Sequence, residues 1–182
     1  MKSPFLFVDQ VDVAGKTVLL RLDLNVPIKD GVITDDTRLQ RVLDGIVDLR
    51  KAGAAIVILT HFGRPKGKIM AEFSVVPVAA RLAELLDCAV TVEADVTGAG
   101  AVAAVGAMSA GDVLMLENLR FYPGEEGNEQ AFAASLAGLG DVYVGDAFSC
   151  AHRAHASVEA LPRLNRRTRA LHVLLARGHR SV

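Results

Sequence analysis

Short apolar runs alternate along the chain with segments whose apolar residues recur every three to four positions. Five runs are typical of buried strands, because they are short, rich in Val, Leu and Ile, and apolar on both faces. They cover residues 17–24, 54–61, 89–95, 112–118 and 141–148. Buried strands separated by helices predict an open parallel sheet with helices on both faces, a three-layer α/β fold of the Rossmann-like type.

Segments whose apolar residues recur with the period of an α-helix lie between these runs. In the segment 35–52, Asp35 and Asp36 open the predicted first turn and Gly53 follows the last, which suits the helix dipole and the usual glycine stop. Three more helices are predicted: one capped by Ser74, an alanine-rich one at 98–108, and one capped by Asn128 that carries Phe132, Leu136 and Leu139.

Composition bounds the possible functions. The 182 residues, 51% of them hydrophobic, suffice for one full domain and are too few for two large ones. The net charge of -1 creates no overall field that would attract nucleic acid or an acidic membrane. No spacing of ligands suggests a metal site, no apolar run is long enough to span a membrane, and the first residues do not resemble a signal peptide. We therefore expect a cytoplasmic domain without a metal of its own.

Polar and cationic side chains follow four of the five predicted strands. The carboxyl ends of parallel strands share one edge of the sheet, where ligands bind in folds of this kind, so these side chains should converge. They are Asp23 and Asn25 after the first strand, His61 and Arg64 after the second, Glu117 and Arg120 after the fourth, and Asp146 and Arg153 after the fifth.

Arg38 adds to this edge from the opening turn of the helix 35–52. A cation there is disfavoured by roughly 0.3–1 kcal/mol, unless an anion shares the helix start. The predicted cations of the edge are thus Arg38, His61, Arg64, Arg120 and Arg153.

Like charges gathered at one edge need a counter-charge. Ordinary ion pairs with Asp23, Glu117 and Asp146 are one interpretation. The other is a bound acid with both phosphate and carboxylate, because arginine binds either group through two parallel hydrogen bonds. Asp23 and Asn25 could then hold a hydroxyl of that acid.

A glycine-rich turn supports a different hypothesis. Gly98, Gly100 and Ala103 match the dinucleotide fingerprint G-x-G-x-x-A after a predicted strand, and Glu117 lies near the distance of the ribose-binding acid. The turn follows the third strand, however, and is lengthened by two residues. An NAD-dependent oxidoreductase using Gly98 and Gly100 is therefore one alternative, and a non-catalytic anion-binding domain is another.

Four segments in register closely resemble phosphoglycerate kinases: VLLRLDLNVP at 18–27, THFGRP at 60–65, LENLRFY at 116–122, and DAF with AHRAHAS within 146–157. The agreement extends to about Leu161, so residues 1–161 resemble the amino-terminal domain of that family. The resemblance implies that the domain holds 3-phosphoglycerate through Asp23, Asn25, Arg38, His61, Arg64, Arg120 and Arg153.

The resemblance also implies a glycolytic phosphotransferase that moves the γ-phosphate of Mg-ATP to the substrate carboxylate, giving ADP and 1,3-bisphosphoglycerate. Arg38 would be the catalytic residue of this half, stabilising charge on the phosphoryl group in transfer. Family members are much longer, and the half that binds nucleotide and magnesium has no counterpart here. We therefore assign no cofactor-binding residue and expect a monomer that is inactive alone.

The sequence departs from the family pattern at several points. Gly145 stands where the family usually has asparagine, and Ser149 where it usually has glycine. Residues 162–182 form a divergent basic tail, since 163–182 contain arginines and histidines but no acid. We interpret this tail as the product of a frameshift followed by a premature stop.

Overall fold

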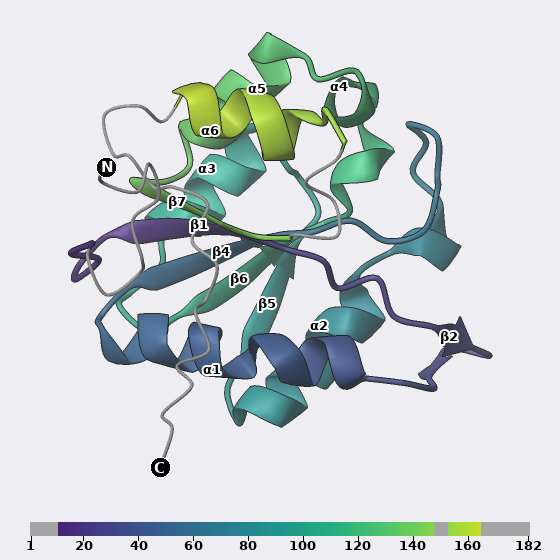
Figure 1. The fold of residues 1–182 in the computed structure, drawn as a ribbon, viewed down its shortest axis with the longest axis horizontal. Helices are drawn as coiled ribbons and strands as arrows, with labels where there is room; N and C mark the ends of the chain where they lie inside the picture. Colours follow the sequence, from purple (N-terminus) through teal and green to yellow (C-terminus); the bar gives the residue numbers. More distant parts are fainter. Residues whose placement is uncertain (1–10, 148–152, 165–182) are drawn as a thin grey trace, which may run out of the picture.

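Five parallel strands form one sheet in the order β5-β6-β4-β1-β7 (Figure 1). The computed structural model describes residues 11–147 and 153–164. The strands are β1 (Thr17–Leu22), β4 (Ala55–Leu59), β5 (Val90–Glu93), β6 (Val113–Leu116) and β7 (Val142–Asp146). The predicted parallel sheet is confirmed. Each strand ends two residues earlier than the sequence suggests.

Strand β1 lies between β4 at the centre of the sheet and β7 at its edge. Leu19 is opposite Val57 on one side and Tyr143 on the other. All residues of β4 are buried, as expected where helices cover both faces. The carboxyl ends of β1 and its two neighbours therefore lie side by side.

Helices cover both faces (Figure 1). On one face lie α1 (Thr37–Lys51) and α2 (Val76–Leu86), and on the other lie α3 (Ala99–Gly106), α5 (Gln130–Ala137) and α6 (Leu161–Leu164). Helix α1 buries its apolar stripe, including Leu39, Val42 and Ile46. No helix in the described ranges is long and apolar enough to cross a membrane.

Two details of the predicted helix starts are wrong. Asp35 and Asp36 precede α1, and Asp35 accepts the N–H of Thr37 at 2.9 Å. Asn128 does not cap α5, because Glu129 holds that position and the Asn128 Nδ2 donates to Glu159 at 3.0 Å. Helix α1 thus starts two residues later than predicted, and the cap position of α5 lies one residue later than predicted.

Short elements missed from the sequence complete the fold. Strands β2 (Ile28–Lys29) and β3 (Val32–Ile33) form a hairpin. Its turn has positive φ at Asp30 and Gly31, which the Asp-Gly pair signals. The others are η2 (Ala71–Phe73), η3 (Leu119–Phe121), α4 (Pro123–Glu126) and the π-helical turn η5 (Ala156–Ala160).

Candidate substrate-binding site

Hydrogen bonds tie the ends of β1, β4 and β6 into one rigid edge. The Thr60 hydroxyl donates to the carbonyl of Leu22 at 3.1 Å, which joins the ends of β4 and β1. Asn25 Oδ1 accepts the N–H of Gly63 at 3.0 Å, and Arg120 Nη1 donates to the Gly63 carbonyl at 2.9 Å. The structure therefore brings Asn25 and Arg120 together around a single glycine after β4.

The loop that carries Arg64 is held at both ends by Arg120. Besides the bond to Gly63, the N–H of Gly67 donates to the Arg120 carbonyl at 3.1 Å. Gly63 has φ +60, and a Cβ there would lie 2.2 Å from the ring of Phe73. Only glycine fits this close approach. The exposed Arg64 is thus presented from a tethered loop.

Asn118 is a buried residue that the sequence interpretation missed. Its Nδ2 donates to the carbonyls of Phe62 and Phe73 at 2.6 and 2.9 Å, and its Oδ1 accepts the N–H groups of Phe62 and Arg120. Both donors and both acceptor positions of the amide are thus used. The available signal was an amide directly after a buried strand. Asn118 fixes the backbone on which His61, Arg64 and Arg120 stand.

Arg38 forms an ion pair with Asp23. Its Nη1 lies 2.5 Å from Asp23 Oδ2, and the Arg38 side chain stays 48% exposed. One cation of the edge is thus balanced by an acid of the chain. Glu117 does not serve this purpose, contrary to one interpretation of the sequence. It accepts the N–H of Val75 at 2.7 Å and the hydroxyl of Ser74 at 2.7 Å, so it holds the start of α2.

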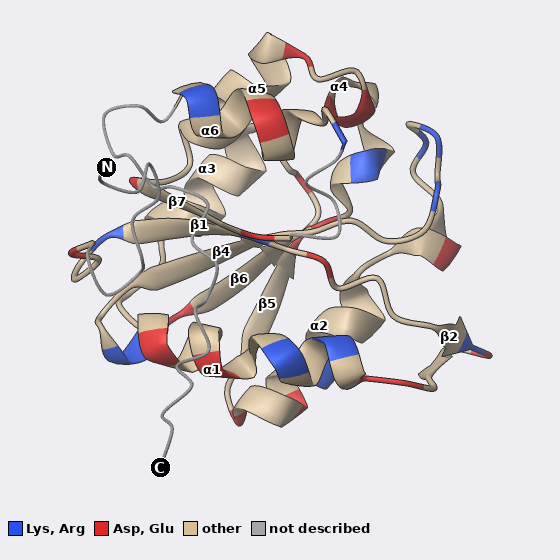
Figure 2. Ribbon diagram, viewed as in Figure 1, with Lys and Arg blue, Asp and Glu red and all other residues tan. Residues whose placement is uncertain are grey.

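The remaining arginines differ in burial. Arg120 is 5% exposed and lies 3.6 Å from Glu126. Arg64 and Arg153 are exposed, and neither has an acidic partner within 4.0 Å in the described part of the chain. Arg120 and Arg153 each lower the pKa of His155, so each of them lies near this histidine. Figure 2 shows basic segments on this side of the sheet, in η3 and the loop after β4.

His61 is not a cation, contrary to the sequence prediction. It is 5% exposed, and its Nδ1 lies 3.0 Å from Nη2 of Arg21. Burial, Arg21 and Arg120 together lower its pKa to about 3, against a smaller opposing effect of Asp23. The ring is therefore neutral near pH 7 and acts at this edge as a hydrogen-bonding group.

A buried network behind the edge was also missed. Arg21 is 1% exposed and Glu125 is fully buried. Ser157 joins them, because its Oγ accepts from Arg21 Nε at 2.8 Å and donates to Glu125 Oε1 at 2.6 Å. Tyr143 donates to the Ser157 carbonyl at 2.8 Å, and burial raises the pKa of its hydroxyl. The network anchors the segment that follows Arg153.

Comparisons with known proteins agree with this architecture. The phosphoglycerate kinase family model matches residues 8–176. The chain belongs to the phosphoglycerate kinase family. A phosphoglycerate kinase of Ruegeria sp. (strain TM1040) is 52% identical over 156 residues, which is 86% of this chain and 39% of that protein. One from Sinorhizobium fredii is 54% identical over 153 residues, or 84% and 38% of the two chains.

Solved phosphoglycerate kinases share the fold. The enzyme of Coxiella burnetii superposes with a TM-score of 0.78 at 38% identity, covering 87% of this chain and 39% of that one. The enzyme of Pyrococcus horikoshii gives 0.80 at 35% identity, covering 88% and 41%. The chain thus spans about two-fifths of the length of the phosphoglycerate kinases that it matches.

The glycine-rich turn of this phosphoglycerate kinase family member is filled by its own acid. Asp95 accepts the N–H groups of Thr97, Gly98 and Gly100 at 3.2, 2.8 and 2.9 Å. These bonds lower the pKa of the Asp95 carboxyl, with the Gly98 N–H contributing most. A pyrophosphate would need the same N–H groups, and the carboxylate would repel it. The turn therefore does not support the NAD alternative.

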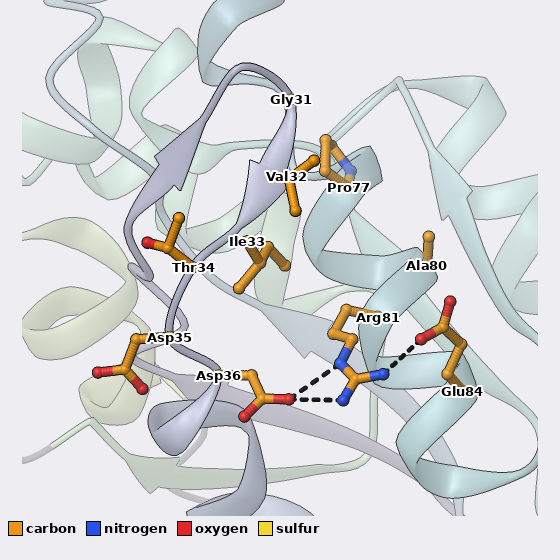
Figure 3. Close-up of a pocket in the computed structure, with 10 residues that line it drawn as sticks. All are labelled: Gly31, Val32, Ile33, Thr34, Asp35, Asp36, Pro77, Ala80, Arg81 and Glu84. Carbon is orange, nitrogen blue, oxygen red and sulfur yellow. Dashed lines mark hydrogen bonds and ion pairs between the residues drawn. The ribbon is translucent and has the colours of Figure 1, made fainter.

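A hollow lies between the β2–β3 hairpin and α2 (Figure 3). It measures about 680 Å³ and contains one arginine, Arg81. Arg81 donates to Asp36 through Nε and Nη2, at 2.9 and 2.7 Å, and to Glu84 at 2.5 Å. Its charge is already balanced by these acids, so the hollow lacks the exposed unpaired arginines of the strand edge. No group of three or more His, Cys, Asp or Glu within 11–147 and 153–164 is arranged to hold a metal ion.

Proposed function

We propose that this chain binds 3-phosphoglycerate at the carboxyl edge of the sheet and forms the acid-binding half of a phosphoglycerate kinase. One observation carries the proposal. Asn25, Gly63 and Arg120 are hydrogen-bonded into a single rigid unit that presents the exposed Arg64. A small acid with two anionic groups is the ligand that such an edge favours.

The charges of the edge suggest how the acid is held. Arg64 and Arg153 are exposed cations without acidic partners among the described residues, so they are free to bind anionic oxygens. Asn25 Oδ1 is engaged by Gly63, which leaves its amide NH₂ to donate to a ligand hydroxyl beside Asp23. His61 adds a neutral hydrogen bond, and the buried Arg120 adds long-range positive charge.

Arg38 is the proposed catalytic residue. Its half-exposed guanidinium sits at the start of α1, where backbone N–H groups also point toward an anion. In the family reaction a substrate carboxylate oxygen attacks the γ-phosphate of the nucleotide, and Arg38 would stabilise charge on the group in transfer. Asp23 holds the guanidinium at this edge before the phosphoryl group arrives.

The nucleotide of the family reaction is assigned to no residue here. The chain covers about two-fifths of its relatives, and Mg-ATP chemistry requires both substrates to be aligned. We therefore propose that the 182-residue chain binds the acid and does not turn it over alone. A complementary nucleotide-binding half, supplied separately, should restore transfer.

Calorimetry tests the binding. The full chain should bind 3-phosphoglycerate, and Arg64→Ala or Arg153→Ala should each weaken binding by about tenfold or more, since a hydrogen bond to a charged group contributes about 1.5–3 kcal/mol. Lys51→Ala is the matched control, because Lys51 is an exposed cation at the opposite end of α1. If all three variants lost affinity equally, the binding would be non-specific charge attraction and the proposed site would be wrong.

A second experiment distinguishes one half of an enzyme from a domain that only binds the acid. ADP should give no heat with the chain alone, whereas addition of a separately made nucleotide-binding half should give measurable phosphoryl transfer in a coupled assay. Binding of 3-phosphoglycerate without such complementation would favour the alternative of a non-catalytic anion-binding domain.

A further inference from the structure

The buried Arg21 touches a member of the candidate site. We infer that Arg21 is a positioning residue that sets the tautomer of His61, placing the ring hydrogen on Nε2 so that His61 is a neutral donor toward the substrate. The substrate part of this inference rests on the proposed function, whereas the tautomer does not.

Only one direction of hydrogen bonding is possible between Arg21 and His61. A guanidinium carries five N–H groups and no acceptor, so Arg21 Nη2 can only donate. It lies 3.0 Å from His61 Nδ1, which must therefore present a lone pair. In a neutral imidazole the hydrogen is then on Nε2. A doubly protonated ring would set two donors against each other at this distance.

Arg21 is held so that this contact persists. Its Nε donates to Ser157 Oγ at 2.8 Å, and its Nη1 donates to the carbonyl of Leu22. Strand register places it opposite Leu59, two residues before His61, and the Leu59 carbonyl lies 3.5 Å from Nη1. Each nitrogen of the guanidinium thus has an acceptor of its own, and Nη2 is left for the ring.

Most of the charged groups around His61 also disfavour a proton on its ring. Arg21 from β1, Arg120 from η3 and His155 from the start of η5 disfavour a proton on the ring, while Asp23 favours one. Burial, the largest effect, also disfavours the charge. Glu125 balances Arg21 through Ser157 rather than through the ring, so it does not draw a proton onto His61.

Nitrogen-15 NMR of the full chain, labelled at histidine, reads the tautomer directly. The His61 ring should show a protonated Nε2 and an unprotonated Nδ1, unchanged from about pH 5.5 to 8. His61→Gln identifies the resonances by removing them. An imidazolium at pH 7, or a hydrogen on Nδ1, overturns the inference. Because no ligand is needed, the result is independent of the proposed function.

The variant Arg21→Lys tests the cause. Lysine keeps a positive charge beside Ser157 and Glu125. Its side chain is shorter than that of arginine, so its single ammonium group should not reach His61 Nδ1. We expect a mixture of tautomers in a ring whose pKa stays lowered by burial and by Arg120, and 3-phosphoglycerate binding weakened about three- to tenfold. Arg50→Lys is the control, since Arg50 Nε donates to the Gly111 carbonyl at 2.9 Å, away from His61.

Each outcome of these NMR and binding experiments supports or overturns a named part of the inference. A folded Arg21→Lys chain whose His61 keeps one tautomer with hydrogen on Nε2 overturns the role of Arg21. If that variant does not fold, the spectrum of the unsubstituted chain decides between the three protonation states. The expected spectrum without any 3-phosphoglycerate binding would defeat the proposed function and leave the tautomer assignment standing.

Discussion

Ser157 and Glu125 are joined by two hydrogen bonds in the interior of the domain. The serine N–H donates to Glu125 Oε2 at 2.9 Å, and its hydroxyl donates to Oε1 at 2.6 Å. The same hydroxyl accepts from Arg21, so a buried carboxylate and a buried guanidinium are bridged by one oxygen. The segment after Arg153 is thereby fixed to strand β1.

Glu125→Gln should destabilise the domain strongly. An amide offers one acceptor where the carboxylate offered two, and Arg21 would lose its buried counter-charge. Breaking a buried pair of this kind typically costs about 3–5 kcal/mol. Urea unfolding should therefore show a clearly lower midpoint with an unchanged slope.

The control for this change is Glu72→Gln, which neutralises an exposed acid in η2. Its effect should stay within about 0.5 kcal/mol. If Glu125→Gln were equally mild, Arg21 and Glu125 would not be energetically coupled through Ser157.

Gly63→Ala should disturb the loop that carries Arg64. The new methyl would lie 2.2 Å from the Phe73 ring, at a φ of +60 that disfavours any side chain. We expect a loss of about 2–4 kcal/mol in unfolding free energy, from overpacking and backbone strain together. Weaker 3-phosphoglycerate binding should accompany it, because Asn25 and Arg120 both bond to Gly63.

Gly31→Ala separates overpacking from backbone strain, the two causes of the loss expected in Gly63→Ala. Gly31 has φ +78, but a Cβ there would meet nothing within 4 Å. It should cost only about 1–2 kcal/mol for the left-handed backbone. Thermal or urea unfolding of both variants gives the difference, and equal losses would show that the Phe73 contact can relax.

The sheet could be predicted because its strands are short, apolar on both faces and spaced by helices. The edge could be predicted for a topological reason, since parallel strands deliver Asn25, His61 and Arg120 to one side whatever the details. The Asp30-Gly31 pair signals a hairpin turn. The hairpin was nevertheless missed, because its two-residue strands leave no periodic pattern.

Other parts of the site depend on contacts that sequence order hides. Arg21, Glu125 and Ser157 come from distant segments, and nothing local shows that an arginine within an apolar strand meets a serine 136 residues later. The neutrality of His61 follows from burial and from Arg21, neither of which is visible in the residues beside it. The prediction that residues 162–182 form a separate tail concerns mostly positions outside the described ranges.

Acid should destabilise the domain through His61. The pKa of the folded ring is about 3 and that of an unfolded chain is near 6.5, so the unfolded state binds more protons between these values. Stability contributed by neutral His61 is fully present above about pH 6.5 and falls as the pH drops toward 3. At pH 5.5 the loss should be on the order of 1 kcal/mol.

Urea midpoints at pH 7 and pH 5.5 check this linkage. His61→Gln, which cannot titrate, should show a smaller loss over the same interval. His155 also has a lowered pKa, mainly from burial, so the double variant with His155→Gln should flatten the dependence further. If His61→Gln lost as much stability between pH 7 and pH 5.5 as the natural chain, other groups would cause the acid sensitivity.

Asp95→Asn should destabilise the start of α3 without creating a dinucleotide site. The amide keeps Oδ1 for Thr97 and Gly98 but replaces Oδ2, the acceptor for Gly100, with a donor. A lost cap of this kind costs about 1 kcal/mol. The depressed pKa of Asp95 means that its contribution is present above the ordinary value of 3.8 and disappears as the pH falls below it.

The difference between the natural chain and Asp95→Asn should therefore be constant from pH 7 to 5 and shrink at pH 3, measured by urea unfolding. Asp44→Asn, an exposed acid of α1, is the control and should show little difference at any pH. NAD should bind neither protein, because the N–H groups of Thr97 and Gly98 remain engaged by residue 95 in both. Saturable NAD binding to Asp95→Asn alone would show that the carboxylate had been blocking a functional dinucleotide turn.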